Sequence, residues 1–217
     1  MKILPALLAH NLDDLNAHLR AAEPHFTEAQ IDLMDGIFVP TKSVSAQDLR
    51  SIQTPLKLEA HLMVGDPTLW IEQLAAAKFK KIIIHQEIGT AMVGAIRIIK
   101  SLGLEVGVAI NPDSEALATK EWWHELDLLQ VMGVIPGHYG ATFQPITLEH
   151  IRTIREAGFT GLIQVDGGVT PETGPMLVSA GAQSLVVGSY LFGSEEQPDL
   201  AKIGEKLHNL RTALGTP

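Results

Sequence analysis

Three short segments, far apart in the chain, each carry a side chain that can take part in proton transfer. Asp32 and Asp166 lie near the ends of two apolar runs, and His61 lies near the end of a third. A carboxylate can remove and return a proton in general acid–base catalysis. A histidine beside two carboxylates can bind a metal ion. These residue types therefore indicate acid/base chemistry, with or without a metal.

The elements that must position these side chains alternate along the whole sequence. Short apolar runs predict strands, and the amphipathic stretches between them predict helices. The expected strands are Ile3–Leu8, Ala29–Met34, Leu58–Met63, Lys81–His85, Glu105–Ile110, Leu126–Met132, Gly161–Val165 and Ser184–Val187. The expected helices are Asp14–Ala22, Thr68–Ala77, Leu148–Ala157 and Glu172–Ala180, with a further helix around Ala46–Ile52 in a longer loop. This alternation predicts a (β/α)8 TIM barrel that forms one domain, residues 1–217.

Helix start and stop signals support this division. Asn11 and Thr147 are predicted N-caps, and Gly103, Gly158 and Gly181 stand where helices should end. An open, doubly wound sheet is the alternative architecture, but it normally carries a glycine-rich turn after its first strand. The glycines of this chain cluster late in the sequence instead, where many barrels bind phosphate, so we favour the barrel.

The composition excludes several classes of function. The chain has 217 residues, of which 46% are hydrophobic and 19% are charged, as expected of a globular protein with a large core. Its net charge is −9 and it has no run of Lys or Arg, so nucleic acid is not expected as a partner. No apolar stretch reaches the roughly 18 residues that a membrane span needs. The absence of cysteine agrees with a reducing, cytoplasmic location.

The barrel also predicts where the chemistry takes place, because active sites of this fold lie at the C-terminal ends of the strands. Strand side chains alternate between faces, so Gln30, Asp32 and Met34 should point the same way. Met63 should likewise share a face with His61. The strands that follow end in or just before His85, Asn111, Met132 and Asp166. We expect these side chains to line one mouth of the barrel.

Six segments of the chain resemble the ribulose-phosphate 3-epimerase family in their order and spacing. They are Ile3–Ala9, Asp32–Pro40, His61–Val64, Val131–Gly137, Val165–Val169 and Val187–Ser189, and the Met-Asp-Gly-x-Phe-Val-Pro motif is the most specific part. The resemblance implies a ribulose-phosphate-binding barrel that interconverts D-ribulose 5-phosphate and D-xylulose 5-phosphate. In that family two aspartates exchange a proton at C3 through an enediolate, and the resemblance assigns these roles to Asp32 and Asp166.

The resemblance also implies a divalent metal, which in this family is zinc, manganese or iron. The family's ligands are His-x-Asp on the second strand, His on the third and Asp on the seventh. The corresponding residues here are Gln30, Asp32, His61 and Asp166, so an amide replaces the first histidine. Because an amide oxygen is a weaker ligand than imidazole, we expect weaker metal binding and a preference for oxygen-loving ions.

The substrate-binding residues that the resemblance implies come from several loops. They are His61, Met34, Met63, Met132, Gly137, His138, Tyr139, Gly140, Gly167, Gly168, Gly188 and Ser189. The glycine pairs at 167–168 and 188–189 are expected to begin helices and to offer backbone N–H groups to a phosphate. Homo-oligomers are common in the family, so a homo-oligomer is also expected.

Departures from the family pattern leave the sugar open. Ala6 replaces a serine, and Tyr139 and Ala141 alter the loop after the sixth strand. These changes motivate two alternatives: an epimerase of another ketose phosphate, such as a six-carbon one, and a non-catalytic sugar-phosphate-binding paralogue. Related decarboxylases and aldolases carry Asp-x-Lys on the third strand, whereas this chain has Glu59-Ala60-His61 there, which disfavours those reactions.

Overall fold

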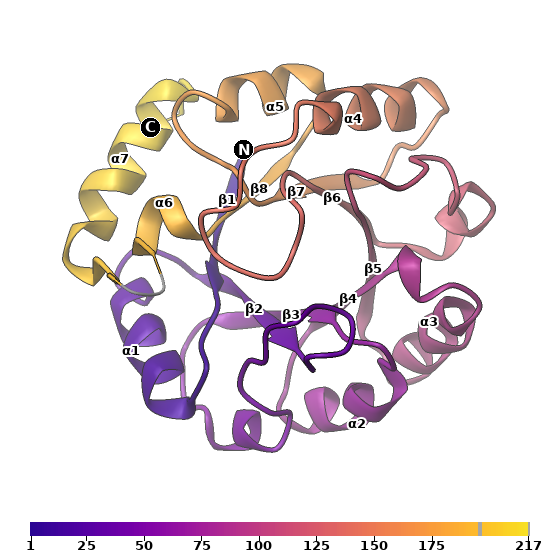
Figure 1. Ribbon diagram of the computed structural model, residues 1–217, viewed down its shortest axis with the longest axis horizontal. Helices are drawn as coiled ribbons and strands as arrows, with labels where there is room; N and C mark the ends of the chain where they lie inside the picture. Colours follow the sequence, from indigo (N-terminus) through magenta and orange to yellow (C-terminus); the bar gives the residue numbers. More distant parts are fainter. Residues whose placement is uncertain (195–196, 217) are drawn as a thin grey trace.

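In the computed structural model, parallel strands β1 to β8 close into a barrel in sequence order, with helices around the outside (Figure 1). The strands are β1 (Lys2–Leu7), β2 (Glu28–Met34), β3 (Lys57–Met63), β4 (Lys81–His85), β5 (Glu105–Ile110), β6 (Leu128–Met132), β7 (Leu162–Asp166) and β8 (Ser184–Val187). The predicted fold class is confirmed, and each predicted strand agrees with the observed one to within two residues at either end. The structure describes residues 1–194 and 197–216, so Glu195, Glu196 and Pro217 of the predicted domain lie outside the described residues.

Helices fill most of the connections between strands. They are α1 (Leu12–Ala22), α2 (Thr68–Ala76), α3 (Ala91–Ser101), α4 (Ile146–Glu156), α5 (Gly174–Ala180), α6 (Ser189–Phe192) and α7 (Ile203–Ala213). Short 3-10 helices are η1 (Asp48–Ser51), η2 (Gln86–Ile88), η3 (Lys120–Glu125) and η4 (Leu200–Lys202). Helix α3 ends just before Gly103, where a helix end was predicted, and α7 is additional to the predicted helices. The helix expected around residue 50 is the 3-10 turn η1. In the described part of the chain, no helix has the length and apolar character to cross a bilayer.

Of the four predicted helix starts, two are confirmed and two are wrong; α2 begins at Thr68, as predicted. Asn11 caps α1, because its side-chain oxygen accepts a hydrogen bond from the backbone N–H of Asp14 at 2.9 Å. Thr147 does not cap α4, which begins one residue earlier, and its hydroxyl instead donates to the carbonyl of Met132 at 3.0 Å. Helix α5 begins at Gly174 rather than at residue 172, because the Thr170 hydroxyl accepts backbone N–H groups of the turn that precedes it.

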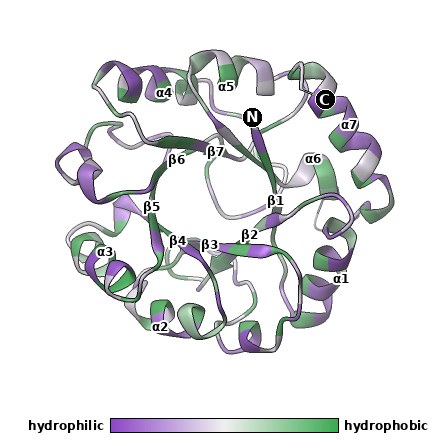
Figure 2. Cartoon of the chain, turned by 180° about the vertical axis from the view of Figure 1, so that it is seen from behind, coloured by the Kyte–Doolittle hydropathy of each residue, from purple (hydrophilic) through white to green (hydrophobic). Residues whose placement is uncertain are grey.

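Most of the apolar core lies between the barrel wall and the helices. The outward-facing side chains of β2 and β4, such as Ile31 and Ile84, belong to this large cluster. Inside the barrel, the apolar side chains form only small groups. Buried polar side chains separate them, among them Gln30, Gln130 and Gln164, each with 0% exposure. Figure 2, seen from the opposite side, shows hydrophilic segments alternating with hydrophobic ones along the strands.

The register of the strands brings the polar side chains to matching heights. Asp32 pairs with His61 across β2 and β3. Met132 pairs with Asp166 across β6 and β7, and Gln130 pairs with Gln164 one pleat below. Because the side-chain period of a strand is two residues, a slip by one residue would turn every one of these groups out of the barrel.

The loops after β6 and β7 approach each other so closely that glycine is required. The N–H of Gly133 donates to the carbonyl of Asp166 at 2.7 Å. A Cβ atom on Gly133 would lie 2.0 Å from the carbonyl oxygen of Gly167, a backbone atom that cannot move aside freely. Gly167 itself has φ of 91°, in the left-handed region that favours glycine. The backbone that carries Asp166 therefore depends on both residues.

We expect Gly133→Ala to lower the free energy of unfolding by about 2–3 kcal/mol, because the new methyl group must displace the neighbouring backbone. Urea unfolding measures the change. Gly94→Ala in α3 is the matched control, since a Cβ there meets no atom within 4 Å. In a helix, alanine is favoured over glycine by about 1 kcal/mol, so the control should be neutral or stabilising. A Gly133→Ala protein as stable as the control would contradict this account.

Candidate active site

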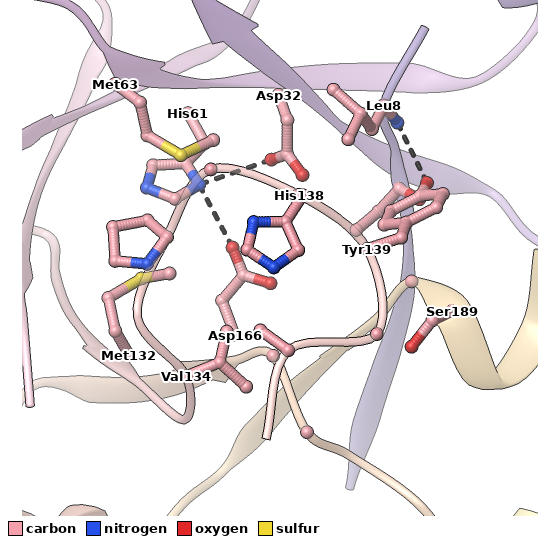
Figure 3. A pocket seen from close by; sticks show the side chains of 18 of the residues that line it. Leu8, Asp32, His61, Met63, Met132, Val134, His138, Tyr139, Asp166 and Ser189 are labelled. Atoms are coloured by element: carbon pink, nitrogen blue, oxygen red, sulfur yellow. Dashed lines mark hydrogen bonds and ion pairs between the residues drawn. The ribbon is translucent and has the colours of Figure 1, made fainter. Parts of the chain in front are cut away.

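A pocket at the C-terminal mouth of the barrel collects nearly all of the residues predicted for the site (Figure 3). The predicted residues that line it are Asp32, Met34, His61, Met63, Met132, Gly137, His138, Tyr139, Gly140, Asp166, Gly167, Gly168, Gly188 and Ser189. Val134, Pro136 and Val169 line it as well and were not predicted, although each is close in sequence to a residue that was. Leu8, which follows β1, also lines it, and no predicted site residue is near it in sequence. Gln30 does not line the pocket but lies fully buried, in contact with two of its carboxylates.

Asp32, His61 and Asp166 form a compact buried group. Nδ1 of His61 lies 3.2 Å from Oδ1 of Asp32 and 3.0 Å from Oδ2 of Asp166. The side chain of His61 is completely buried, and those of the two aspartates are less than one tenth exposed. One ligand atom from each of the three residues can be chosen so that all lie within 4.8 Å of one another. The group therefore combines two possible acid/base carboxylates with a possible metal site.

Burial and close contact decide the charges of this group. Burial is the largest influence on the pKa of Asp32 and raises it, and the negative charge of Asp166 raises it further. The hydrogen bonds from His61 and Gln30 lower this pKa, but the net shift is upward. Burial alone would lower the pKa of His61, but the hydrogen bonds and charges of Asp166 and Asp32 raise it to about 9. Without a metal, an imidazolium between two carboxylates is thus the favoured state at neutral pH.

Gln30 holds the two carboxylates together. Its Nε2 donates to Oδ1 of Asp32 at 2.8 Å and to Oδ2 of Asp166 at 2.7 Å, which uses both amide hydrogens. Its Oε1 lies 3.4 Å from Nε2 of Gln164, on the side of the amide away from the carboxylates. In this orientation Gln30 presents N–H groups, so it would have to turn its amide to serve as the metal ligand that the resemblance implies.

These contacts leave one oxygen of each carboxylate for the pocket. Oδ1 of Asp32 and Oδ2 of Asp166 receive the hydrogen bonds from His61 and Gln30. Within the described part of the chain, no hydrogen bond reaches Oδ2 of Asp32 or Oδ1 of Asp166. Each carboxylate is therefore anchored through one oxygen and has the other available for proton transfer.

A second histidine lies behind His61 and does not line the pocket, contrary to expectation. Nε2 of His85 lies 2.9 Å from Nε2 of His61, and its Nδ1 lies 3.0 Å from Oε2 of Glu87. Burial lowers the pKa of His85 to about 4 despite Glu87, so His85 is neutral. Its contact with His61 determines which nitrogen of His61 faces the carboxylates. Asn111 also lies outside the pocket, with its backbone N–H bonded to Glu87 at 2.9 Å.

The loop after β6 reaches across the pocket to β1. The hydroxyl of Tyr139 donates to the carbonyl of Ala6 at 2.5 Å and accepts the N–H of Leu8 at 2.8 Å. Burial and the charge of Asp32 raise the pKa of Tyr139, so its phenol stays protonated and can donate. The free space in the pocket is about 50 Å³, room for only a few water molecules. A sugar phosphate therefore requires side chains or loops at the mouth to shift.

The two glycine pairs both line the pocket, but only one of them precedes a helix. Gly188 comes directly before α6, as predicted. Gly168 does not begin a helix, because a turn intervenes in which the Thr173 hydroxyl donates to its carbonyl at 2.6 Å. The backbone N–H groups of the 167–168 pair therefore belong to a loop rather than to a helix start.

The donor set fits a divalent metal at three of the four implied positions. Asp32 and Asp166 offer carboxylate oxygens and His61 offers an imidazole nitrogen, a combination that suits zinc, manganese or iron. A ligating imidazole must be neutral, whereas His61 is protonated when it pairs with the carboxylates, so metal binding here must release a proton.

Comparisons with known proteins agree with the site. The model of the ribulose-phosphate 3 epimerase family matches residues 2–192. The chain belongs to this family. It is 32% identical over 205 residues to ribulose-phosphate 3-epimerase from Bacillus subtilis (strain 168), and the alignment covers 91% of this chain and 94% of that protein. It is 33% identical over 202 residues to the cytoplasmic isoform from Oryza sativa subsp. japonica, covering 90% and 89%. The family is one of enzymes, the ribulose-phosphate epimerases.

Solved structures share the barrel at much lower identity than these epimerases. A 3-hexulose-6-phosphate synthase matches with a TM-score of 0.72 and 17% identity over 99% of this chain and 100% of that one. A 3-keto-L-gulonate-6-phosphate decarboxylase from Vibrio cholerae matches with a TM-score of 0.72 and 14% identity over 99% and 97%. At such identities the likeness shows the fold alone.

For the metal-free epimerase-family protein, we predict a loss of stability at alkaline pH. The pKa of His61 is about 9 in the folded state and about 6.5 in an unfolded chain. Its ion pairs therefore stabilise the fold fully below about pH 6.5, and this contribution is lost as the pH rises through about 9.

In chelator, the free energy of unfolding should fall by up to about 3 kcal/mol between pH 6.5 and pH 10, as measured by urea unfolding. His61→Gln provides the control, because it removes the titrating group and should flatten this part of the curve. If the variant and the parent protein lose stability in parallel, the proposed ion pair is wrong.

Proposed function

We propose that this chain interconverts D-ribulose 5-phosphate and D-xylulose 5-phosphate, working as one domain. The observation that carries the proposal is the pair of buried carboxylates, Asp32 and Asp166, in one pocket, each with an oxygen that receives no hydrogen bond from the described residues. Membership of the epimerase family supports a phosphorylated ketose as the substrate.

In the proposed reaction, one aspartate removes the C3 proton from one face of the sugar and the other returns a proton to the opposite face. The oxygens that act are Oδ2 of Asp32 and Oδ1 of Asp166, since His61 and Gln30 occupy the others. A proton next to a ketone is only weakly acidic, so the enediolate that forms needs stabilisation of its negative charge. Met34, Met63 and Met132 form an apolar wall that keeps water away from it.

We propose that Asp32, His61 and Asp166 hold a divalent metal ion. When bound, such an ion supplies Lewis-acid stabilisation to the charge that develops on the substrate oxygens. For this role His61 has to give up the proton on Nδ1, the nitrogen that faces the carboxylates. Its Nε2 keeps its contact with neutral His85, 2.9 Å away. The Gln30 amide, which now donates to both carboxylates, competes with the ion for their oxygens.

The remainder of the pocket suits a short phosphorylated sugar. We propose that the backbone around Gly167–Gly168 and Gly188–Ser189 binds the phosphate, because peptide N–H groups bind anions without a cationic side chain. Family membership favours ribulose 5-phosphate, a five-carbon ketose, over a six-carbon one.

The first test converts each carboxylate into an amide, which replaces one oxygen by an NH₂ group. Asp32→Asn and Asp166→Asn should each lower turnover of ribulose 5-phosphate by at least about 10³-fold, because neither amide can accept the C3 proton. Product formation and incorporation of deuterium at C3 in D₂O are measured together, and thermal unfolding checks that the fold is intact.

Asp35→Asn is the matched control, since its carboxylate accepts loop N–H groups and does not line the pocket. It should keep turnover within about tenfold. Full activity in either of the first two variants would remove the two-aspartate assignment. Ligand binding by the parent protein without any exchange at C3 would favour the non-catalytic paralogue.

The second test concerns the metal. Chelation should abolish turnover, and added zinc, manganese or iron should restore it, because the charge on the enediolate is otherwise poorly stabilised. Gln30→His should bind the metal at least about tenfold more tightly, since it completes the four-ligand set and removes the competing amide. Calorimetry and metal content after dialysis measure the affinity, and turnover that chelation leaves unchanged would remove the metal from the proposal.

A further inference from the structure

The interior of the barrel below Asp166 holds a continuous column of buried polar side chains. A TIM barrel is normally filled by branched apolar residues at these positions, so a polar column needs a physical explanation. Its members come from β3, β4, β6, β7 and β8, and none is more than 6% exposed. They are Glu59, Lys81, Gln130, Gln164 and Ser184, with Gln30 as a branch from β2.

The direction of the hydrogen bonds is set from the lower end of this column. Nζ of Lys81 donates to Oε2 of Glu59 at 3.1 Å, and a carboxylate paired in this way can only accept hydrogen bonds. Gln164 must therefore turn its NH₂ group toward Glu59, and Nε2 of Gln164 lies 2.6 Å from Oε1 of Glu59. Its Oε1 accepts the Ser184 hydroxyl at 2.8 Å. The Gln164 amide thus has one orientation.

The fixed Gln164 amide orients Gln130 in turn. Nε2 of Gln164 donates to Oε1 of Gln130 at 2.9 Å, so the NH₂ group of Gln130 points upward. There it donates to Oδ2 of Asp166 at 3.0 Å. The same oxygen has Nε2 of Gln30 at 2.7 Å and Nδ1 of His61 at 3.0 Å. Three groups thus anchor one oxygen of Asp166, and the other faces the pocket.

We infer that Gln130 is a positioning residue for Asp166, and that the Lys81–Glu59 pair sets the direction of its amide through Gln164. The inference rests on the proposed epimerisation. A reversed Gln130 amide would place its oxygen against Oδ2 of Asp166, and two buried acceptors in contact repel each other. The Asp166 side chain would then rotate, and its Oδ1 would no longer point into the pocket. In the described part of the chain, no hydrogen bond joins Gln130 to Asp32, so Asp32 keeps its position.

Because Gln130 contacts only one of the two carboxylates, its loss should affect only one face of the sugar. Gln130→Leu keeps the side-chain size and removes the N–H donor. The initial rate of C3 exchange in D₂O should fall roughly ten- to hundredfold from one ketose-phosphate epimer, as expected for a hydrogen bond to a charged group. From the other epimer it should stay within about twofold. The epimer from which Asp166→Asn loses C3 exchange is the one that Asp166 deprotonates, and Gln130→Leu should affect the same epimer. KM and kcat of Gln130→Leu are measured for both epimers, and the change is expected in kcat.

Two further variants test the origin of the orientation. Glu59→Gln should lower exchange mainly from the same epimer, because an amide at position 59 can meet Gln164 in either direction. Exchange from the other epimer should fall less, since Gln164 meets Gln30, which contacts both carboxylates, at the longer distance of 3.4 Å. Ser184→Ala is the matched control: its hydroxyl can donate or accept, so it does not dictate the orientation, and exchange from both epimers should be unchanged.

The outcomes separate the inference from the function on which it rests. An equal loss from both epimers in Gln130→Leu, or no loss from either, overturns the positioning role while the parent protein remains an epimerase. Absence of C3 exchange in the parent protein overturns the proposed function and the inference with it. Thermal unfolding establishes that each variant is folded, and Gln130→Met, which also lacks the donor, replaces Gln130→Leu if that variant does not fold.

Discussion

Two negative charges buried in one cavity stay close together only if hydrogen-bond donors are supplied to both, and the mouth of this barrel is organised around that constraint. Asp32 and Asp166 come from strands far apart in the sequence, and His61 and Gln30 each donate to both of them. The donors take one oxygen from each carboxylate, which decides the oxygens that remain for a substrate. The closed barrel and its strand register bring the four side chains together.

The same constraint continues downward into the barrel. A half-satisfied polar network in a protein interior is worse than an apolar one, because each unpaired group has lost its water. Here the pairing is complete: among the described residues, the buried side-chain atoms without a partner are Gln86 Oε1, Asn111 Oδ1 and His150 Nδ1, and none belongs to the column. The column therefore transmits the orientation of one charged pair at its base to a carboxylate at the mouth without leaving any group unpaired.

The sequence alone predicted the parts of this arrangement that depend on local pattern. Alternating apolar runs placed the strands, and the period of two residues placed Asp32 and His61 on the inner face of the wall. The roles that depend on contacts between distant strands could not be predicted. Gln130 lies within an apolar run, and nothing in that run shows that its amide meets Asp166. Thr147 looked like a helix cap because no local signal reveals its contact with the Met132 carbonyl.

The Tyr139 hydroxyl joins the loop after β6 to two backbone groups of the first strand and its end, and this bridge has a kinetic consequence. With it in place the pocket has about 50 Å³ of free space, so a bound sugar phosphate requires side chains or loops at the mouth to shift. Loop opening limits kcat in many enzymes, and any opening of the loop after β6 would have to break the two hydrogen bonds of Tyr139 or carry the end of β1 with it.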